Sequence, residues 1–424
     1  MADEPAISFD ELVVYRQELY RFCTGHVDSL TAFHNGISFK LNTQERKLGP
    51  RDRHLSSSAT CIESLLDCPP MLWAKKTLDV VKLARRFGLS ALRRSPKRWT
   101  SDGSAPIYCR CRTLPLIVSH LPEYQPTVRK HLETILFQLK RDPGRFAIGE
   151  ASGDDPDNWY PPNAFHTFWI LHLLSTLQKR FPPNFSRLCA VFRRTRYDIE
   201  RLREEMLIWA QEAAGYQIAL HTSKSSMLDS DQLAWALTII ITFGKDFQAN
   251  LAQQDFINSA LSCLFEHQTD AGIWRTGRPL FHYKESGNAY CYIFETFAML
   301  LRSSLITRKE ALFVRRALFP YANQLLKLWR YATVTKIRLF ENKEIFGWSS
   351  GHRVNRKIAE SWATASAYSF SQYLRRLLGI WTREEAAKQL KVVHPASQSK
   401  RHYEIFQNLA ILGRAKGNQL QPSC

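Results

Sequence analysis

The sequence predicts an all-α protein built from six helical hairpins in two concentric layers. Three observations favour this fold: apolar residues recur at helical spacing, two kinds of helical segment alternate, and similar glycine-containing loops precede one of the two kinds. One kind is charged with a single apolar stripe, which is typical of a surface helix. The other is apolar nearly all round, which is typical of a buried helix. A repeat of this sort indicates the architecture of a whole chain.

The two kinds of helix can be placed along the chain by their apolar pattern. The outer, charged helices are expected at 9–24, 73–92, 128–139, 199–211, 256–268 and 311–329. The inner, apolar helices are expected at 56–66, 105–121, 163–177, 229–243, 287–301 and 359–378. Each interval between successive inner helices has room for one outer helix and a loop, so the order predicts six hairpins.

The loops that lead to the inner helices share a glycine followed by an apolar or aromatic residue, as in QTDAGIW at 268–274. A glycine just past a helix end can adopt the left-handed conformation that caps the helix. Gly272 is therefore predicted to end an outer helix. Trp274 is predicted to fill the space between two hairpins.

One of these loops has a wider resemblance. The segment INSALSCLFEHQTDAGIW (257–274) resembles the QW motif of terpenoid cyclases, in which a helix carrying A-L-x-x-L is followed by Q-x3-G-x-W. The resemblance implies that the hairpins close into an (α/α)6 double-ringed toroid, the fold that these cyclases share with protein prenyltransferases. It also implies that Gln268 ties the helix end while Trp274 stacks across the gap. Glycosidases and lanthipeptide cyclases use similar loops in six-hairpin toroids, and a helical solenoid is the alternative architecture.

Composition favours one large domain, expected over residues 1–395, followed by a basic tail with a short helix over 396–424. The 45% hydrophobic content supports a large core, and the longest apolar runs are shorter than the roughly 20 residues that span a bilayer. The N-terminus is acidic and lacks the pattern of a signal peptide. Nine scattered cysteines suit a reducing compartment, and no C-x-x-C pair suggests a zinc finger. We therefore expect a cytoplasmic protein without a membrane span.

The formal net charge of +19 has two interpretations. The charge can be spread over solvated outer helix faces, or it can attract a polyanion. A nucleic acid, an acidic protein or a small anionic ligand in the toroid cavity are the partners that such a charge would suit. No known nucleic-acid-binding motif accompanies the basic residues.

Candidate catalytic residues lie at the starts of the inner helices, which a toroid would bring to one mouth. DSDQ (229–232) stands where the cyclases that open their substrate by protonation carry D-x-D-D, although Gln232 replaces the last aspartate. The resemblance implies that Asp231 is the general acid, with a pKa raised by burial and by the neighbouring Asp229. The alternative is an N-cap in which Asp229 accepts hydrogen bonds from first-turn amides. His166, in another inner first turn, is the third candidate.

Basic residues in the last two inward loops form a candidate anion-binding rim, because arginine suits phosphate or carboxylate. The members of this rim are Arg275, Arg278, His282, Lys284, His352 and Arg353. Solvation is the alternative for these residues. The acidic loop 153–163 could hold a divalent cation or be solvated, and no specific metal or cofactor is identified. Aromatic residues on the inner segments could line a cavity for an isoprenoid or pack the core.

Two functional hypotheses of different class follow. In the first, the chain is an enzyme with a central cavity that acts on an isoprenoid-like or phosphorylated substrate, with Asp231 as the acid and the basic rim as the anion clamp. In the second, it is a catalytically inactive toroid whose basic faces hold a protein or nucleic-acid partner. The departures from known catalytic signatures favour the second hypothesis, and the polar starts of the inner helices favour the first.

Overall fold

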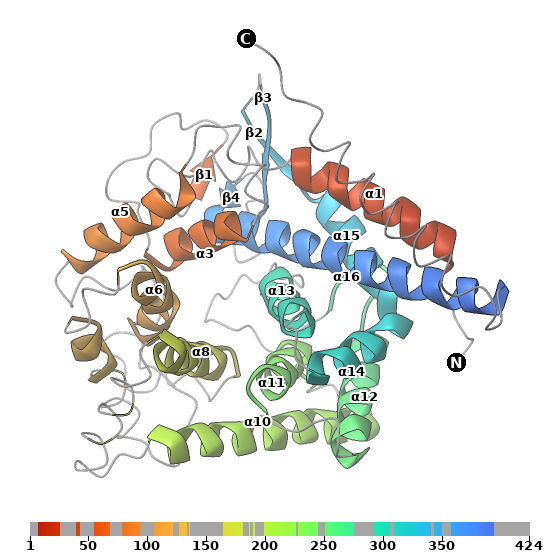
Figure 1. Cartoon of the computed structure of the whole chain (residues 1–424), viewed down its shortest axis with the longest axis horizontal. Coiled ribbons are helices and arrows are strands. Elements are labelled where there is room, and N and C mark those ends of the chain that lie inside the picture. Colours follow the sequence, from red (N-terminus) through yellow and green to blue (C-terminus); the bar gives the residue numbers. More distant parts are fainter. Residues whose placement is uncertain are drawn as a thin grey trace.

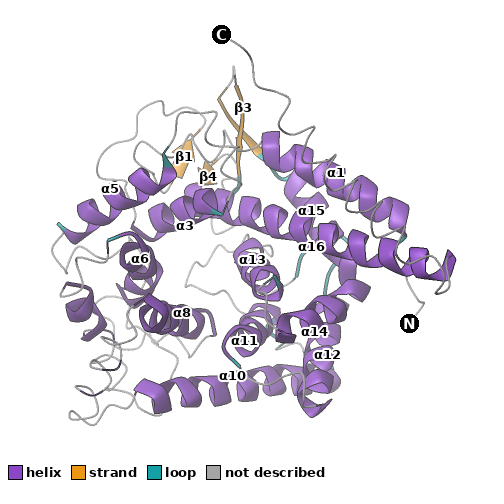
Figure 2. Ribbon diagram, in the orientation of Figure 1, coloured by secondary structure: helices purple, strands orange, loops and turns teal. Residues whose placement is uncertain are grey.

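Helices make up most of the chain that can be described, which confirms the all-α prediction at the level of fold class (Figure 2). The computed structural model describes residues 7–25, 40–42, 55–67, 79–93, 106–121, 127–133, 135, 164–180, 186, 190, 199–225, 228–244, 251–274, 292–305, 309–340, 343–349 and 358–393. The predicted tail, 396–424, lies outside these residues. Among the described helices, none has the length and apolar character needed to cross a membrane.

Six helices correspond to the predicted inner helices, and they pack in ring order. They are α3 (Leu55–Leu66), α6 (Pro106–His120), α8 (Ala164–Arg180), α11 (Ser230–Phe243), α13 (Tyr292–Ser304) and α16 (Ser361–Val393). Each contacts the next along the chain, and α16 returns to contact α3. α16 is much longer than the predicted 359–378 and runs from beside β4 and α3 to the right-hand edge of the molecule in Figure 1.

The charged helices lie outside these six. They are α1 (Phe9–Gly25), α5 (Val80–Leu92), α10 (Ile199–Thr222), α12 (Leu251–Glu266), α14 (Lys309–Leu318) and α15 (Ala322–Val334), with residues 127–133 also helical. α1 packs on α16, α5 on α3 and α6, α10 and α12 on α11, and α14 on α13 (Figure 1). Each described outer helix therefore covers an inner one, as the alternating pattern predicts.

The last outer helix differs from its prediction. A single helix is expected over 311–329, but α14 ends at Leu318, and a 3-10 turn, η4 (Phe319–Tyr321), separates it from α15. Pro320 lies in this turn. Its ring has no backbone N–H and clashes with the preceding turn of a continuous helix, so the proline explains the break.

Two short antiparallel strand pairs were not predicted. β1 (Lys40–Asn42) pairs with β4 (Ile358–Glu360), and β2 (Ile337–Phe340) pairs with β3 (Lys343–Gly347). β4 leads directly into α16, so its pairing with β1 attaches an early segment to the start of the last inner helix. Figure 2 shows both pairs at one edge of the helical body.

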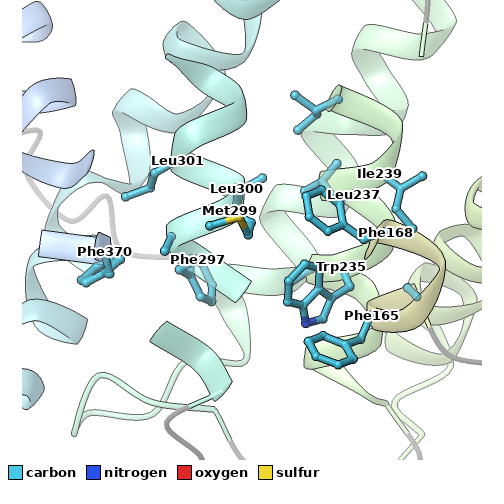
Figure 3. Packing of buried hydrophobic residues seen from close by; sticks show 14 of the residues in the cluster. Phe165, Phe168, Trp235, Leu237, Ile239, Phe297, Met299, Leu300, Leu301 and Phe370 are labelled. Atoms are coloured by element: carbon cyan, nitrogen blue, oxygen red, sulfur yellow. The ribbon is translucent and has the colours of Figure 1, made fainter. Parts of the chain in front are cut away.

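Aromatic residues of neighbouring inner helices pack on one another in the core. The Trp235 indole of α11 lies 5.1 Å, between ring centroids, from both Phe165 and Phe168 of α8, as Figure 3 shows. Elsewhere among the inner helices, the ring centroid of Phe294 in α13 lies 5.8 Å from that of Phe370 in α16. These side chains are at most 8% exposed, so packing in the core accounts for these five aromatic residues.

The loop QTDAGIW folds into a turn that joins three helices. α12 ends at Glu266, and Gly272 lies beyond it in a turn where Thr269 N donates to Ile273 O at 2.8 Å. Gly272 has a φ of +82°, but its place is in this turn and not at the helix end, which corrects the prediction that it ends the helix. A Cβ at Gly272 would lie 2.5 Å from the carbonyl oxygen of Lys327 in α15. Only glycine therefore fits both the backbone conformation and the close approach.

Trp274 is 1% exposed and lies between α12 and α13. Its indole stacks on Phe297 of α13 with centroids 4.5 Å apart, and its Nε1 donates to the carbonyl oxygen of Leu264 in α12 at 2.6 Å. Gln268 Nε2 donates to Gly272 O at 2.9 Å and to Gln324 O of α15 at 2.8 Å. The loop thus fills the gap between helices with the indole and ties its own turn to α15 with the glutamine.

Candidate functional site

The first turns of α8, α11 and α13 are joined by side-chain hydrogen bonds. Gln232, at the start of α11, accepts through Oε1 from the backbone amide of Ala164, the first residue of α8, at 2.9 Å. On the other side of α11, Thr296 of α13 donates from Oγ1 to Asp231 Oδ1 at 2.8 Å. These three helices therefore begin side by side, and Asp231 lies between two of them.

Asp229 occupies the N-cap position of α11. Its Oδ1 accepts from the backbone amides of Asp231 and Gln232, each at 3.1 Å. Its own backbone amide donates to Gln217 Oε1 of α10 at 2.8 Å. Aspartate is among the preferred N-cap residues because its side chain satisfies amides that lack a partner within the helix. The structure thus gives Asp229 the capping role that was the alternative to a catalytic one.

Asp231 is a buried carboxyl group beside two other acids. Its side chain belongs to a residue that is only 8% exposed. Burial raises the pKa of Asp231 to about 8, and the nearby carboxylates of Asp229 and Glu295 raise it as well, whereas the hydrogen bond from Thr296 lowers it. This raised pKa favours the protonated form of the group at neutral pH. Carboxyl groups in this state can serve as general acids.

A buried ion network lies next to Asp231, across α3, α6 and α13. The guanidinium of Arg112, in α6, contacts Glu63 of α3 through Nη1 and donates from Nε to Thr60 Oγ1 at 3.1 Å. Arg112 Nε also lies 3.8 Å from Glu295 Oε1 of α13. The guanidinium carbon stands 4.0 Å from the centre of the Trp169 ring, a cation–π contact. One arginine thus joins two acids from different helices.

Glu295 is the second acid of the site with a shifted pKa. Burial raises the pKa of Glu295 to about 7, Arg112 lowers it and Glu63 raises it. Within the described residues, Glu295 Oε1 has no hydrogen-bond partner, although the residue is only 3% exposed. Titratable groups with such shifts gather at functional sites more often than elsewhere, and buried ion networks shift pKa values too.

A small pocket between α3, α13 and α16 extends from this network. Arg112 and Glu295 line one end, and Asp67, Arg302 and Tyr373 line the other. Tyr373 donates from its hydroxyl to Asp67 Oδ2. Burial raises the pKa of the Tyr373 phenol, so this tyrosine remains a donor. Most residues that line the pocket are polar or charged, Ala298 and Met299 add apolar surface, and Asp231 is not among the described residues that line it.

His166 lies in the first turn of α8 and is 4% exposed. Its ring centroid stands 5.4 Å from that of Phe165, which in turn packs on Trp235. His166 is in the same turn of α8 as Ala164, whose backbone amide donates to Gln232. The structure places His166 in the layer where the inner helices begin, as predicted, with an aromatic environment on one side.

The predicted basic rim lies outside the described residues. This applies to Arg275, Arg278, His282, Lys284, His352 and Arg353, and to the acidic loop 153–163. In the sequence, the described elements that follow these segments are α8, α13 and β4.

Sequence reasoning missed the residues at the centre of the site, which are Glu63, Arg112, Glu295, Thr296, Asp67 and Tyr373. A signal for two of them was present. Arg112 and Glu295 are charged residues inside segments that are otherwise apolar and predicted to be buried. A buried charge requires a partner of opposite sign, so each could have been used to search for the other.

The comparisons with known proteins do not add to this description. No protein-family model, no curated protein and no solved structure matches the chain.

Proposed function

We propose that the chain is an enzyme with the closed α/α toroid architecture of terpenoid cyclases and prenyltransferases, and that it acts by acid catalysis on an isoprenoid-like, phosphorylated substrate. Two features support the toroid: the ring-order contacts of the six inner helices, and the loop in which Trp274 fills the gap between α12 and α13. The resemblance to the QW motif in the sequence points in the same direction.

The observation that carries the proposal is the buried carboxyl group of Asp231, which accepts a hydrogen bond from Thr296 at the start of α11. Burial and neighbouring acids hold its pKa at about 8, so the carboxyl group has a proton to donate at neutral pH. Thr296 donates to Oδ1, which leaves the proton on Oδ2. Protonation of a carbon–carbon double bond by Oδ2 would create a cation and leave Asp231 as a carboxylate. Transfer of a proton from a neighbouring carbon of the cation to that carboxylate would complete an isomerisation and restore the acid.

The remaining parts of the site have roles consistent with this chemistry. The starts of α8, α11 and α13 lie together, and helix N-termini favour anions such as a phosphate group. Burial and the carboxylate of Asp229 do most to raise the pKa of Asp231, and Glu295 contributes less.

The experiment that tests the proposal combines a titration with an activity assay. A linear prenyl diphosphate is incubated with the full chain, and products of unchanged mass but altered chromatographic retention are sought. Asp231→Asn should abolish conversion and leave the fold intact, because asparagine keeps the acceptor for Thr296. In parallel, the Asp231 carboxyl carbon should titrate well above the ordinary aspartate range by NMR. Conversion that persists in the Asn variant, or an ordinary pKa for Asp231, would exclude this mechanism.

A second function, a basic scaffold without catalysis, is favoured by one observation. Arg112 lies between Glu63, Glu295 and Trp169 and contacts all three, so paired side chains occupy this part of the space between the inner helices. In this function the net charge of +19 would hold an acidic protein or a nucleic acid. Binding of a DNA duplex of arbitrary sequence that weakens steeply with salt and is unchanged in Asp231→Asn would support it.

A further inference from the structure

A group of metal-binding side chains lies between the ends of α10 and α12, outside the six inner helices. His221 is in the last turn of α10, Cys263 is in the last turn of α12, and His267 follows that helix directly. Cys263 and His267 are four residues apart, a spacing that places side chains on one face of a helix. One ligand atom from each of the three residues lies within 4.8 Å of the other two. His221 Nδ1 and His267 Nε2 are only 2.7 Å apart.

A carboxylate orients His221 through the ring nitrogen that does not face His267 and Cys263. His221 Nε2 lies 3.0 Å from Glu266 Oε2. Glu266 is itself held, because its Oε1 accepts from Ser262 Oγ at 2.6 Å. A hydrogen on Nε2 directed at Glu266 leaves the lone pair of His221 on Nδ1, toward His267. Histidines that bind metals nearly always have such a partner for their second nitrogen.

We propose that His221 Nδ1, His267 Nε2 and Cys263 Sγ bind a zinc ion, while Glu266 orients His221 and Ser262 holds Glu266 in place. Two imidazole nitrogens and a thiolate are the donors that zinc prefers, whereas calcium and magnesium take oxygen ligands. Zinc bonds of about 2.0 Å to nitrogen and about 2.3 Å to sulfur place tetrahedral ligands roughly 3.3–3.5 Å apart. The two ring nitrogens must therefore separate slightly, and the sulfur must approach them.

These adjustments are within the reach of side-chain rotation. The His221 and Glu266 side chains are 29% and 34% exposed, so they have freedom to move and the ion has access. Cys263 is 1% exposed and forms the inner wall of the group. On binding, the hydrogen between the two rings moves to Nδ1 of His267, and Cys263 gives up its thiol proton to solvent. One proton is thus released for each zinc ion bound.

Three protein ligands leave a fourth position for water or for an external ligand. The location suggests a structural effect in addition. The segment after His221 leads to Asp229 and α11, and the residue after His267 is Gln268 of the loop that holds Trp274. A zinc ion here would fasten two outer helices beside both loops. This inference is independent of the proposed activity, because none of its residues belongs to the Asp231 site.

The test uses the full chain after treatment with a chelator and titration with Co²⁺, a spectroscopic substitute for zinc. We expect one ion per chain, a thiolate-to-cobalt charge-transfer band, the visible bands of tetrahedral cobalt, and displacement by Zn²⁺. Cys263→Ser should remove the charge-transfer band. His221→Gln should weaken binding strongly, and Glu266→Gln should weaken it by roughly 10–100-fold.

Cys61→Ser is the matched control, because Cys61 is also buried and its Sγ donates to Ser361 O, a bond that serine keeps. This variant should bind cobalt like the natural chain. Circular dichroism checks that every variant is folded, and His221→Gln, at a partly exposed position, provides a folded variant if Cys263→Ser does not fold. Failure of the natural chain to take up one cobalt ion would overturn the proposal. So would equal cobalt binding by the variants at Cys61, Cys263 and His221.

Discussion

Removal of the Trp274 indole is expected to be among the most destabilising single changes in the chain. The side chain is 1% exposed, stacks on Phe297 and donates its N–H to Leu264 O at 2.6 Å. Replacing a buried aromatic residue by alanine costs roughly 3–5 kcal/mol through lost transfer free energy and the remaining cavity. Loss of the indole hydrogen bond adds about 1 kcal/mol. We therefore expect Trp274→Ala to lower the free energy of unfolding by about 4–6 kcal/mol, the sum of these two contributions.

Urea unfolding followed by far-ultraviolet circular dichroism measures this loss, with the slope against urea expected to stay unchanged. Trp274→Phe is the control, since it keeps a ring against Phe297 and loses the hydrogen bond and part of the volume. It should cost about 1–2 kcal/mol, so it remains measurable even if the alanine variant is too unstable to purify. A loss below about 1 kcal/mol for Trp274→Ala, within the range of surface changes, would refute the role of the indole as the filler between α12 and α13.

Three further predictions concern the same part of the molecule. Gly272→Ala should lower the thermal midpoint markedly, because the added Cβ would lie 2.5 Å from Lys327 O and the φ of +82° disfavours any side chain; an unchanged midpoint would contradict this turn geometry. Asp229→Ala should cost about 1 kcal/mol in urea unfolding through loss of the α11 cap, whereas Asp229→Ser should cost much less. Asp231 has a pKa of about 8 in the folded chain and an ordinary value of 3.8 when exposed. Between these pH values the folded state holds a proton that the unfolded state has released. The free energy of unfolding therefore falls as pH rises from about 4 to about 8. Asp231→Asn should therefore gain stability relative to the natural chain across that interval, and parallel pH profiles would exclude the shift.

Much of the helical organisation could be predicted from the sequence because burial leaves a periodic trace. The inner segment 229–243 is apolar nearly all round, and α11 occupies almost the same residues. The break at Pro320 was equally visible in the sequence and was missed because the apolar spacing continues through it. β1 and β4 could not be predicted, since each has three residues and its pairing depends on chain segments more than 300 residues apart.

The candidate site was predictable only in part, for a related reason. The DSDQ stretch marks its own helix start, so Asp229 and Asp231 were found by local pattern. Arg112 contacts Glu63 and Glu295, partners that lie 49 and 183 positions away along the chain. No local spacing reveals such a network, because the ring of helices brings its members together.

The charge balance of this network bears on which of the two proposed functions is correct. Two arginines, Arg112 and Arg302, lie beside the acids Glu63, Asp67 and Glu295 in this network. The acids therefore outnumber the positive charges, and no cation is among the groups that shift the pKa of Asp231. Burial then favours the protonated forms of two acids, with a pKa of about 7 for Glu295 and about 8 for Asp231. A scaffold would be served equally well by glutamine and asparagine at these positions, which form hydrogen bonds without the cost of burying an ionisable group. Acids that keep their protons near neutral pH are useful to a site that must donate one, and for this reason we favour catalysis over a purely structural role for the network.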